Sequence, residues 1–552
     1  MDDASRLSYS NGPSDQPLIG ETIGANLDAT AAAFGDREAL VDVPSGQRWT
    51  YAQLNADADA LASGLIAAGI AAGDRVGIWS PNRPEWVLLQ YATAKMGAIL
   101  VNINPAYRSH ELAFVLRQSG VRMLVSAQQF KTSDYRAMID EVRGDLPSLR
   151  EVIYLGAGEW TRLAAGQGTA AQQRAALDRR AAELSFDDPI NIQYTSGTTG
   201  FPKGATLSHH NILNNGYFIG ELCRYTERDR VAIPVPFYHC FGMVLGNLAC
   251  TTHGAAIIIP AAGFDPAATL AAVAAERCTS LYGVPTMFIA ELGLPDFASY
   301  DLSSLRTGIM AGSPCPVEVM KRVVSEMHMS EVTICYGMTE TSPVSAQTRA
   351  DDDMERRVST VGRVHPYVEV KIVDPETGLT MPRGATGEMC TRGYSVMLGY
   401  WDDPEQTSAA IDQARWMHTG DLAVMDEAGY LNIVGRIKDM IIRGGENVYP
   451  REIEEFLYSH PAVEDVQVIG VPDTKYGEEI CAWVKLRPGQ QLTEQELREF
   501  CTGQIAHFKI PRYLRITTEF PMTVTGKVQK FKMRDTSITE LGLESAASAE
   551  TA

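Results

Sequence analysis

The sequence lacks the features of several protein classes. Its nine cysteines lie between Cys223 and Cys501 without a C-x-x-C pair, and this spacing argues against a disulfide framework or a zinc site. A formal net charge of −20 argues against a nucleic-acid or anionic-membrane binder, because both need a basic surface. No apolar run is long enough to span a bilayer, and residues 1–17 have neither the apolar core of a secretory signal nor an Arg-rich transit pattern. These absences predict a soluble, cytoplasmic protein.

Three common catalytic signatures are missing as well. The Walker pattern needs Gly directly before Lys and Ser or Thr directly after it, whereas Pro202 precedes Lys203 and Gly204 follows it. The chain has no G-x-G-x-x-G dinucleotide fingerprint and no G-x-S-x-G nucleophile elbow. The sequence therefore does not favour a P-loop NTPase, a dinucleotide-binding enzyme or a serine hydrolase of the elbow type.

Strand-like and helix-like segments alternate from residue 50 onward, which predicts parallel α/β sheets covered on both faces. Thr50 and Gln53 form a capping box that begins a helix, and Gly69 ends it. Residues 160–185, rich in Ala and Gln, predict a surface helix or excursion. Further strands are predicted at 75–79, 98–103, 121–126, 280–284 and 306–310, and helices at 84–97, 111–118, 270–275 and 318–327.

Two changes of pattern predict the remaining organisation of this 552-residue chain, which is too long for one core. Val368–Val373 alternates with period two and is followed by turn residues, which predicts a small barrel over about 358–435. After Gly435-Arg436 the pattern becomes α+β. We therefore predict an α/β fold with a large N-terminal domain over 1–437, a smaller α+β domain over 438–540 and a disordered tail over 541–552.

The segment Tyr194–Gly204 (YTSGTTGFPKG) combines hydroxyl side chains, glycines and one lysine after a predicted buried strand. Glycine lets backbone N–H groups approach an oxyanion, hydroxyls donate hydrogen bonds to it, and lysine adds a point charge, so the loop suits a polyphosphate. The segment closely resembles the phosphate-binding loop of the adenylate-forming enzymes, which include acyl-CoA synthetases, peptide-synthetase adenylation domains and beetle luciferases. The resemblance implies nucleotide binding by Thr195, Ser196, Gly197, Thr198, Thr199, Gly200, Phe201, Pro202 and Lys203.

Further segments resemble the same family, in the family's order, over roughly residues 30–535. They are Pro236–His239, Ala311–Pro314, Tyr336–Glu340, Thr419–Asp421, Gly435–Asp439, Gly444–Pro450 and Thr525–Lys527. Each segment alone has an ordinary structural explanation, such as a core histidine or a solvated carboxylate. Their joint occurrence in a fixed order makes that explanation untenable, and it predicts an AMP-binding domain in residues 1–437.

The resemblance implies a role for individual residues. Tyr336 would stack on adenine, Asp421 would hold the ribose, and Arg436 would contact the nucleotide. Glu340 and Thr195 would bind Mg²⁺, His239 would lie beside the acyl pocket, and Lys438 would be the hinge. The predicted catalytic residues are Lys527, Glu340, Thr195, Lys203 and His239, and the remaining nucleotide- and CoA-binding residues are Gly312, Ser313, Pro314, Gly337, Met338, Thr339, Gly444 and Gly445.

The implied chemistry explains these residue types. A carboxylate becomes a good acyl donor when it attacks the α-phosphate of ATP, because AMP is then the leaving group. Both reactants are anions, so Mg²⁺ and the cations Lys203 and Lys527 would offset their repulsion. A swing of the C-terminal domain about Lys438 would then remove Lys527 and present Gly444-Gly445 to the pantetheine of coenzyme A.

The whole-chain pattern most resembles the medium-chain fatty-acyl-CoA synthetase branch, through runs such as Tyr282–Phe288, Val396–Trp401 and Ala506–Pro511. The implied reaction is ATP-dependent ligation of a medium- to long-chain fatty acid to CoA, with small molecules as partners. Activation of an aryl or other acid, transfer of the acyl group to a carrier protein, a luciferase-type oxygenase and a homodimer are left open. A peptide-synthetase module is disfavoured because the chain ends without a carrier domain.

Overall fold

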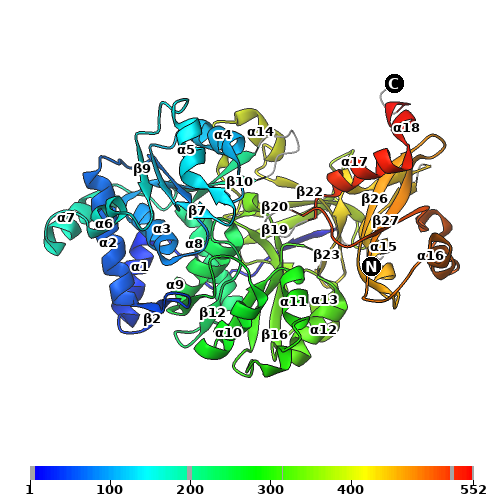
Figure 1. The fold of residues 1–552 in the computed structure, drawn as a ribbon, viewed down its shortest axis with the longest axis horizontal. Helices are drawn as coiled ribbons and strands as arrows, with labels where there is room; N and C mark the ends of the chain where they lie inside the picture. The colour runs from blue at the N-terminus through cyan, green and yellow to red at the C-terminus, as the bar shows by residue number, and fades with distance from the viewer. Residues whose placement is uncertain (1–6, 196–201, 314, 445, 523–527, 550–552) are drawn as a thin grey trace, which may run out of the picture. The chain divides into compact units, whose positions relative to one another are not determined.

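The computed structural model describes residues 7–195, 202–313, 315–444, 446–522 and 528–549, and Figure 1 traces the chain from end to end. The chain divides into two compact units. Unit 1 comprises residues 1–9, 371–390 and 419–552, and unit 2 comprises residues 10–370 and 391–418. The predicted domain boundary at residue 438 lies inside unit 1 and does not coincide with the division between the two units. The boundary therefore stays a prediction.

A seven-stranded sheet in unit 2 has the order β21-β11-β10-β5-β4-β6-β9. From β10 to β9 every neighbouring pair is parallel, whereas β11 pairs antiparallel with both β10 and β21. Strands β5 and β6 are buried along their whole length, as expected when helices cover both faces of a parallel sheet. The strands are β4 (Arg75–Trp79), β5 (Ile99–Asn102), β6 (Met123–Ser126), β9 (Glu151–Tyr154), β10 (Pro189–Thr195), β11 (Lys203–Ser208) and β21 (Gly399–Tyr400).

The helices that accompany this sheet begin and end largely where the sequence predicts. The capping box of Thr50 and Gln53 begins α2, and Gly97, at φ +76°, ends α3. Residues 158–181 form two short helices with few buried side chains, which confirms the predicted surface excursion. The helices are α1 (Ile23–Phe34), α2 (Tyr51–Ala67), α3 (Pro84–Met96), α4 (Ser109–Ser119), α5 (Tyr135–Arg143), α6 (Gly158–Ala165), α7 (Ala170–Ala181) and α14 (Pro404–Ala410), and a small hairpin joins β7 (Gln129–Phe130) and β8 (Ser133–Asp134).

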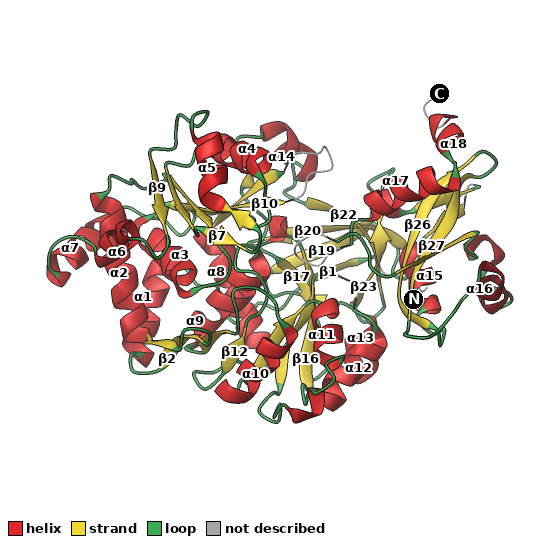
Figure 2. Cartoon of the chain, in the orientation of Figure 1, coloured by secondary structure: helices red, strands yellow, loops and turns green. Residues whose placement is uncertain are grey.

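A nine-stranded sheet, also in unit 2, has the order β18-β17-β16-β15-β14-β12-β13-β2-β3. Its central strands are parallel, and Figure 2 shows α10, α11 and α12 beside them. The strands are β2 (Glu38–Asp42), β3 (Gln47–Thr50), β12 (Arg230–Ala232), β13 (Ala256–Ile259), β14 (Ser280–Gly283), β15 (Thr307–Ala311), β16 (Glu331–Gly337), β17 (Val344–Gln347) and β18 (Arg363–Val364). The helices are α8 (His209–Leu222), the π-helix η1 (Phe241–Leu248), α9 (Ala249–His253), α10 (Pro266–Glu276), α11 (Pro285–Leu292), α12 (Val317–Glu326) and α13 (Met354–Ser359), with the 3₁₀ turns η2 (Phe297–Ser299) and η3 (Thr339–Thr341).

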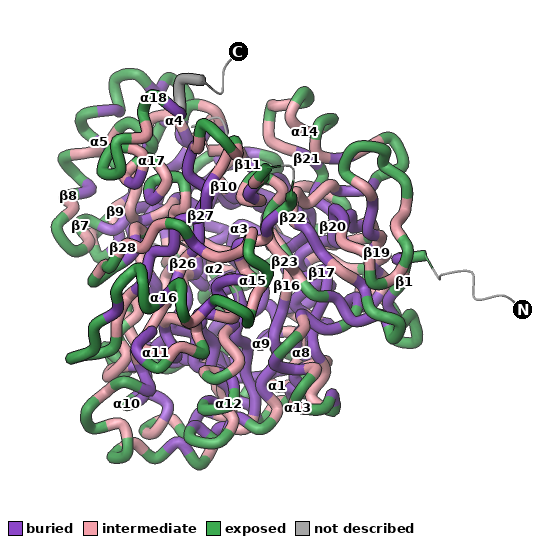
Figure 3. Tube along the Cα trace, turned by 90° about the vertical axis from the view of Figure 1, so that its right-hand side faces the viewer, coloured by how far each residue is buried: buried purple, intermediate pink, exposed green. Residues whose placement is uncertain are grey.

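Strands of the predicted barrel region form a five-stranded sheet in the order β1-β19-β20-β22-β23, with the N-terminal strand β1 at one end. Strand β19 alternates buried and half-buried residues over its first four positions, as its period-two sequence predicts, and Figure 3 shows the buried backbone of β20 in purple. The strands are β1 (Tyr9–Asn11), β19 (Val368–Val373), β20 (Thr386–Gly393), β22 (Met417–Met425) and β23 (Leu431–Arg436).

The C-terminal part of unit 1 has its own apolar core. Strand β27 is the centre of its sheet, because it pairs antiparallel with β26 and β24 and parallel with β28. The core side chains come from this sheet and from α15 and α16. The elements are η4 (Ile437–Asp439), β24 (Ile441–Arg443), β25 (Glu446–Val448), α15 (Pro450–Leu457), β26 (Val463–Asp473), β27 (Gly477–Leu486), α16 (Glu494–Cys501), η5 (His507–Lys509), β28 (Tyr513–Thr517), α17 (Lys530–Leu541) and α18 (Glu544–Ala549).

The end of the chain differs from the sequence prediction. Residues Glu544–Ala549 form helix α18, although a disordered tail was predicted from residue 541. Polar and small residues are compatible with disorder, but alanine has the highest helix propensity, and Ala546 is buried at 8% exposure. Among the helices of the described ranges, none has the length and apolar character that a membrane crossing requires.

One buried acid stands apart from the apolar core around it. Glu291, near the end of α11, is 1% exposed, and neither carboxyl oxygen has a hydrogen-bond partner among the described residues. Burial raises the pKa of this carboxyl well above its ordinary value of 4.5. The folded protein therefore holds a proton that the unfolded chain releases, and this difference destabilises the fold as pH rises above about 4.5.

We expect Glu291→Leu to raise the melting temperature at pH 8, because it removes an unpartnered polar group that costs roughly 1–3 kcal/mol. Glu291→Gln keeps an unpartnered polar group but does not titrate, so it serves as the matched control. The gain of both variants over wild type should shrink between pH 8 and pH 5, as measured by differential scanning fluorimetry. A gain of the same size at both pH values would show that Glu291 does not change protonation on folding.

Candidate active site

Strands β10 and β11 are the two sides of the phosphate loop. Thr195, the last residue of β10, is the register partner of Lys203, the first residue of β11. Because β10 runs parallel to β5, Thr195 lies at the carboxyl end of a parallel strand, where open α/β sheets bind ligands. Pro202 is half-buried beside Lys203. The predicted loop residues 196–201 lie outside the described residues.

Glu340 approaches this edge from the other sheet of unit 2. Strand β16 ends at Gly337, and the 3₁₀ turn η3 that follows carries Glu340, which is 5% exposed. The Thr195 hydroxyl Oγ1 donates to Glu340 Oε1 at 3.2 Å, although the two residues are 145 positions apart in the sequence. The structure thus brings together the two predicted Mg²⁺ ligands. Carboxylate and hydroxyl oxygens are hard ligands of the kind that Mg²⁺ takes, so the pair fits this ion.

Lys203 is fixed by two neighbours on the chain after residue 399. Its Nζ donates to Gln406 Oε1 at 2.6 Å and lies 5.2 Å from the centroid of the Tyr400 ring. The positive charge is therefore held close to Thr195, its partner across the hairpin. A lysine in this position can attract a phosphate oxygen without supplying a fixed bidentate geometry.

His239 lies between β12 and the π-helix η1 and is half-buried. Its Nδ1 accepts from the backbone N–H of Phe241 at 3.2 Å, which leaves Nε2 to carry the proton of the neutral ring. The flanking residues are anchored to the sheet: the amide of Asn102 donates to the carbonyl of Tyr238, and the Cys240 thiol donates to Gln193.

Cys240 itself is fully buried beside this histidine. Burial raises the pKa of its thiol to about 12, so the group stays protonated at neutral pH. The burial of this thiol does not favour a cysteine nucleophile at this position.

The predicted adenine-binding segments follow adjacent parallel strands of the nine-stranded sheet. Gly312 and Ser313 come directly after β15, and Tyr336 is the penultimate residue of β16. Gly312 has φ +95°, a conformation that favours glycine. The backbone at Gly337 is packed so tightly that a Cβ there would lie 1.7 Å from the carbonyl oxygen of Pro343.

The residues of the predicted adenine-binding segments differ in how far they are buried. Tyr336 and Met338 are half-buried, whereas Thr339 is buried and the backbone of Gly337 is exposed. The predicted residue Pro314 lies outside the described residues. The carboxyl ends of β15 and β16 therefore carry most of the predicted adenine site on neighbouring loops.

Unit 1 holds the remaining described candidates. Asp421 on β22 and Arg436 on β23 are register partners, and the guanidinium lies 3.2 Å from the Asp421 carboxylate. Lys438 lies in η4, directly after β23. Gly444 has φ +61°, and its N–H donates to the carbonyl of Tyr476 at 2.7 Å. Gly445 and Lys527 lie outside the described residues.

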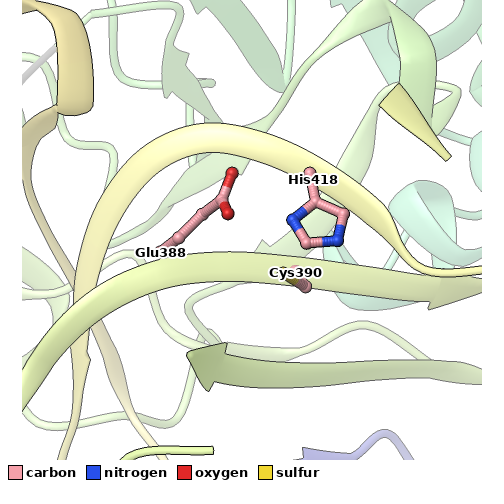
Figure 4. Close-up of side chains that lie close together, drawn as sticks. All are labelled: Glu388, Cys390 and His418. Carbon is pink, nitrogen blue, oxygen red and sulfur yellow. The ribbon is translucent and has the colours of Figure 1, made fainter. Parts of the chain in front are cut away.

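Figure 4 shows three side chains of metal-binding type, Glu388 and Cys390 on β20 and His418 on β22. Glu388 already accepts a hydrogen bond from the backbone N–H of Gly420 at 3.0 Å. That bond fixes the turn before Asp421, which is a structural role, and we assign no ion to these residues.

Comparison with known proteins finds relatives that match most of the chain. A family model described as AMP-binding enzyme matches residues 27–401, and one described as AMP-binding enzyme C-terminal domain matches residues 452–527. The chain is 50% identical to the putative acyl-CoA synthetase YngI of Bacillus subtilis over 96% of this chain and 99% of that protein. The chain belongs to the AMP-binding enzyme family.

Other relatives extend the likeness. The mitochondrial medium-chain acyl-CoA ligase ACSF2 of Danio rerio is 46% identical over 97% of this chain and 91% of that protein. The crystal structure of anthranilate CoA ligase AuaEII with anthranoyl-AMP matches with a TM-score of 0.82 at 28% identity, covering 95% and 98% of the two chains. ATP-bound MatB from Rhodopseudomonas palustris matches with a TM-score of 0.80 at 30% identity, covering 94% and 99%. As a member of this family the chain is an AMP-forming ligase that uses ATP, CoA and Mg²⁺.

Two residues of this AMP-binding enzyme contact the predicted site without having been predicted. Tyr400 donates from its hydroxyl to Glu340, and Gln406 accepts from Lys203. The only signal in the sequence was the family-like run Val396–Trp401, which contains Tyr400 but says nothing of its partners. A distance of 60 residues separates Tyr400 from Glu340, and no periodicity predicts such a pair.

Proposed function

We propose that the protein is an ATP-dependent fatty-acid–CoA ligase. The fatty-acid carboxylate attacks the α-phosphate of ATP, which forms an acyl-adenylate and releases pyrophosphate. The thiol of CoA then attacks the acyl carbonyl, which forms acyl-CoA and releases AMP. The observation that carries this proposal is the contact between Thr195 and Glu340 beside Lys203, because it gathers a hydroxyl, a carboxylate and a cation at the phosphate loop.

Each candidate residue then has a role in the first step. Mg²⁺, held by Glu340 and Thr195, would neutralise charge on the polyphosphate. Lys203 attracts phosphate oxygens, and the loop residues donate hydrogen bonds to them. Tyr336 and the glycine segment at 312 flank adenine, and Asp421 accepts from the ribose hydroxyls with Arg436 beside it. Lys527 brings a cation to the carboxylate and the α-phosphate.

The second step requires that Lys527 leave the reacting centre. We propose a hinge at Lys438, with residues 438–540 moving as one domain, so that Gly444 and Gly445 then meet the pantetheine thiol. The separate core of α15, α16 and their sheet supports a domain that moves as one body. In this arrangement Lys527 serves only the first half-reaction, adenylation.

The medium-chain acyl-CoA ligase relatives support a medium- to long-chain fatty acid. An aryl acid is the second candidate, because the fold matches an anthranilate CoA ligase with a TM-score of 0.82. The alternative to CoA as the acceptor of the acyl group is a carrier protein.

A substrate panel tests these candidates. Purified protein with ATP, Mg²⁺ and CoA is incubated with saturated acids of graded chain length, with benzoate and anthranilate, and with amino acids, and AMP release is measured. We expect the highest kcat/KM for an acid of medium or long chain. A preference for an aryl acid would replace the fatty acid in the proposal, and AMP release without acyl-CoA would point to a carrier-protein acceptor.

Two further properties belong to the same proposal. All nine cysteines are free and buried, which supports a reducing, cytoplasmic environment. A homodimer is proposed only as the state to be tested, and light scattering coupled to size exclusion would measure it directly.

A further inference from the structure

The carboxylate of Glu340 has a second hydrogen-bond donor besides Thr195. The hydroxyl of Tyr400 donates to Glu340 Oε1 at 2.9 Å, and Thr195 Oγ1 donates to the same oxygen at 3.2 Å. Among the described residues no side chain donates to the other oxygen, Oε2. Two donors on one oxygen fix the plane of a carboxylate and leave its second oxygen for a cation.

The same tyrosine also faces Lys203. The Lys203 ammonium lies 5.2 Å from the centroid of the Tyr400 ring, within the range of a cation–π contact. Lys203 in turn donates to Gln406, six residues after Tyr400. One aromatic side chain therefore contacts both the acidic and the basic residue of the phosphate site.

The backbone around Tyr400 is fixed on both sides. Strand β21 pairs with β11, so that Tyr400 is the register partner of Ala205. The N–H of Tyr400 donates to the Thr407 hydroxyl at 2.9 Å. Asp403 caps α14 by accepting from the N–H of Gln406 at 3.0 Å. Tyr400 and Gln406 are thus presented by one short, internally bonded segment, 399–407.

We propose that Tyr400 is a positioning residue that orients the Glu340 carboxylate for Mg²⁺·ATP and keeps Lys203 beside it. Partners of metal-binding carboxylates tune metal affinity because they fix the ligand before the ion arrives. This inference rests on the proposed role of Glu340, but it is independent of the acid and of the acyl acceptor.

The first part of the test is a metal titration that needs neither acid nor CoA, and the second is the rate of acid-dependent ATP–pyrophosphate exchange. Mn²⁺ replaces Mg²⁺, and its binding to the protein with ATP is followed by electron paramagnetic resonance in wild type, Tyr400→Phe, Glu340→Gln and Tyr51→Phe. Tyr51 is the matched control, because its buried hydroxyl donates to the carbonyl of Ala255 at 2.6 Å in a different part of unit 2. Melting temperatures are measured on all four proteins.

We expect Tyr400→Phe to raise the half-saturating Mn²⁺ concentration roughly tenfold or more, the effect typical of removing a partner of a metal ligand. At saturating metal its rate of ATP–pyrophosphate exchange should approach that of wild type. Tyr51→Phe should bind Mn²⁺ like wild type, whatever its melting temperature. Wild-type Mn²⁺ binding in Tyr400→Phe overturns the proposal. If Glu340→Gln also binds Mn²⁺ like wild type, the proposed role of Glu340 in metal binding is overturned as well. Inactivity toward every acid would overturn only the proposed function.

Discussion

Glu340→Gln is expected to lower acid-dependent ATP–pyrophosphate exchange by roughly 10²-fold or more, the scale on which preorganised charge acts in active sites. Glutamine keeps the size of the side chain and an oxygen that can accept from Thr195 and Tyr400. It removes the negative charge that would hold Mg²⁺. The melting temperature should therefore stay near that of wild type while the exchange rate falls at every Mg²⁺ concentration.

Glu291→Gln is the matched control for this experiment. It makes the same Glu-to-Gln replacement at another buried glutamate, whose carboxyl is already protonated in the folded protein and which lies on α11, outside the proposed site. Its exchange rate should equal that of wild type. An equal loss in both variants would indicate a general effect of replacing a buried glutamate by glutamine. A wild-type exchange rate in Glu340→Gln would show that another group binds the metal.

The fold was predictable where local pattern and tertiary environment agree. The strands at 75–79 and 121–126 are short apolar runs between turn residues, and they became β4 and β6 of the parallel sheet. The capping box at Thr50 predicted the first residue of α2, because the box satisfies backbone N–H groups at one particular position. Local signals of this kind do not depend on distant residues.

Features that depend on distant contacts were beyond reach. The π-helix η1 directly after His239 has no signal in its apolar sequence, since a π-helix and an α-helix use the same residue types. Helix α18 replaced a predicted disordered tail because composition does not record whether Ala546 finds a surface to pack on. The division into two units likewise depends on which strands pair across the chain.

The candidate site shows the same contrast. Resemblance alone named Thr195 and Glu340, and the structure places them within hydrogen-bond distance. Nothing in the sequence joined Tyr400 to Glu340 or Gln406 to Lys203, because a tyrosine and a glutamine carry no motif of their own. Reactive residues can be recognised in the sequence from their residue types and from the order of their motifs. Residues that orient them are recognised only from their contacts in the folded structure.

Lys527→Ala should separate the two half-reactions. The cation at this position is proposed to offset the repulsion between the acid and the α-phosphate, so its loss should slow ATP–pyrophosphate exchange roughly 10²- to 10³-fold. Thioester formation from supplied acyl-adenylate and CoA needs no such cation, because the mixed anhydride already exists and AMP is ready to leave. That half-reaction should therefore stay within a few-fold of wild type.

The matched control is Lys532→Ala, which removes an exposed lysine five residues later, on α17. Both half-reactions should proceed at wild-type rates in this variant, since a solvated surface charge contributes little to a buried reacting centre. If Lys527→Ala slows both half-reactions equally, the lysine acts on the fold or on nucleotide binding in general. The proposed rotation of the C-terminal domain between the two steps would then have no chemical reason. Loss confined to adenylation would show that Lys527 is needed at the reacting centre only in the first step, before the CoA thiol arrives. The proposed hinge between the two steps requires this order.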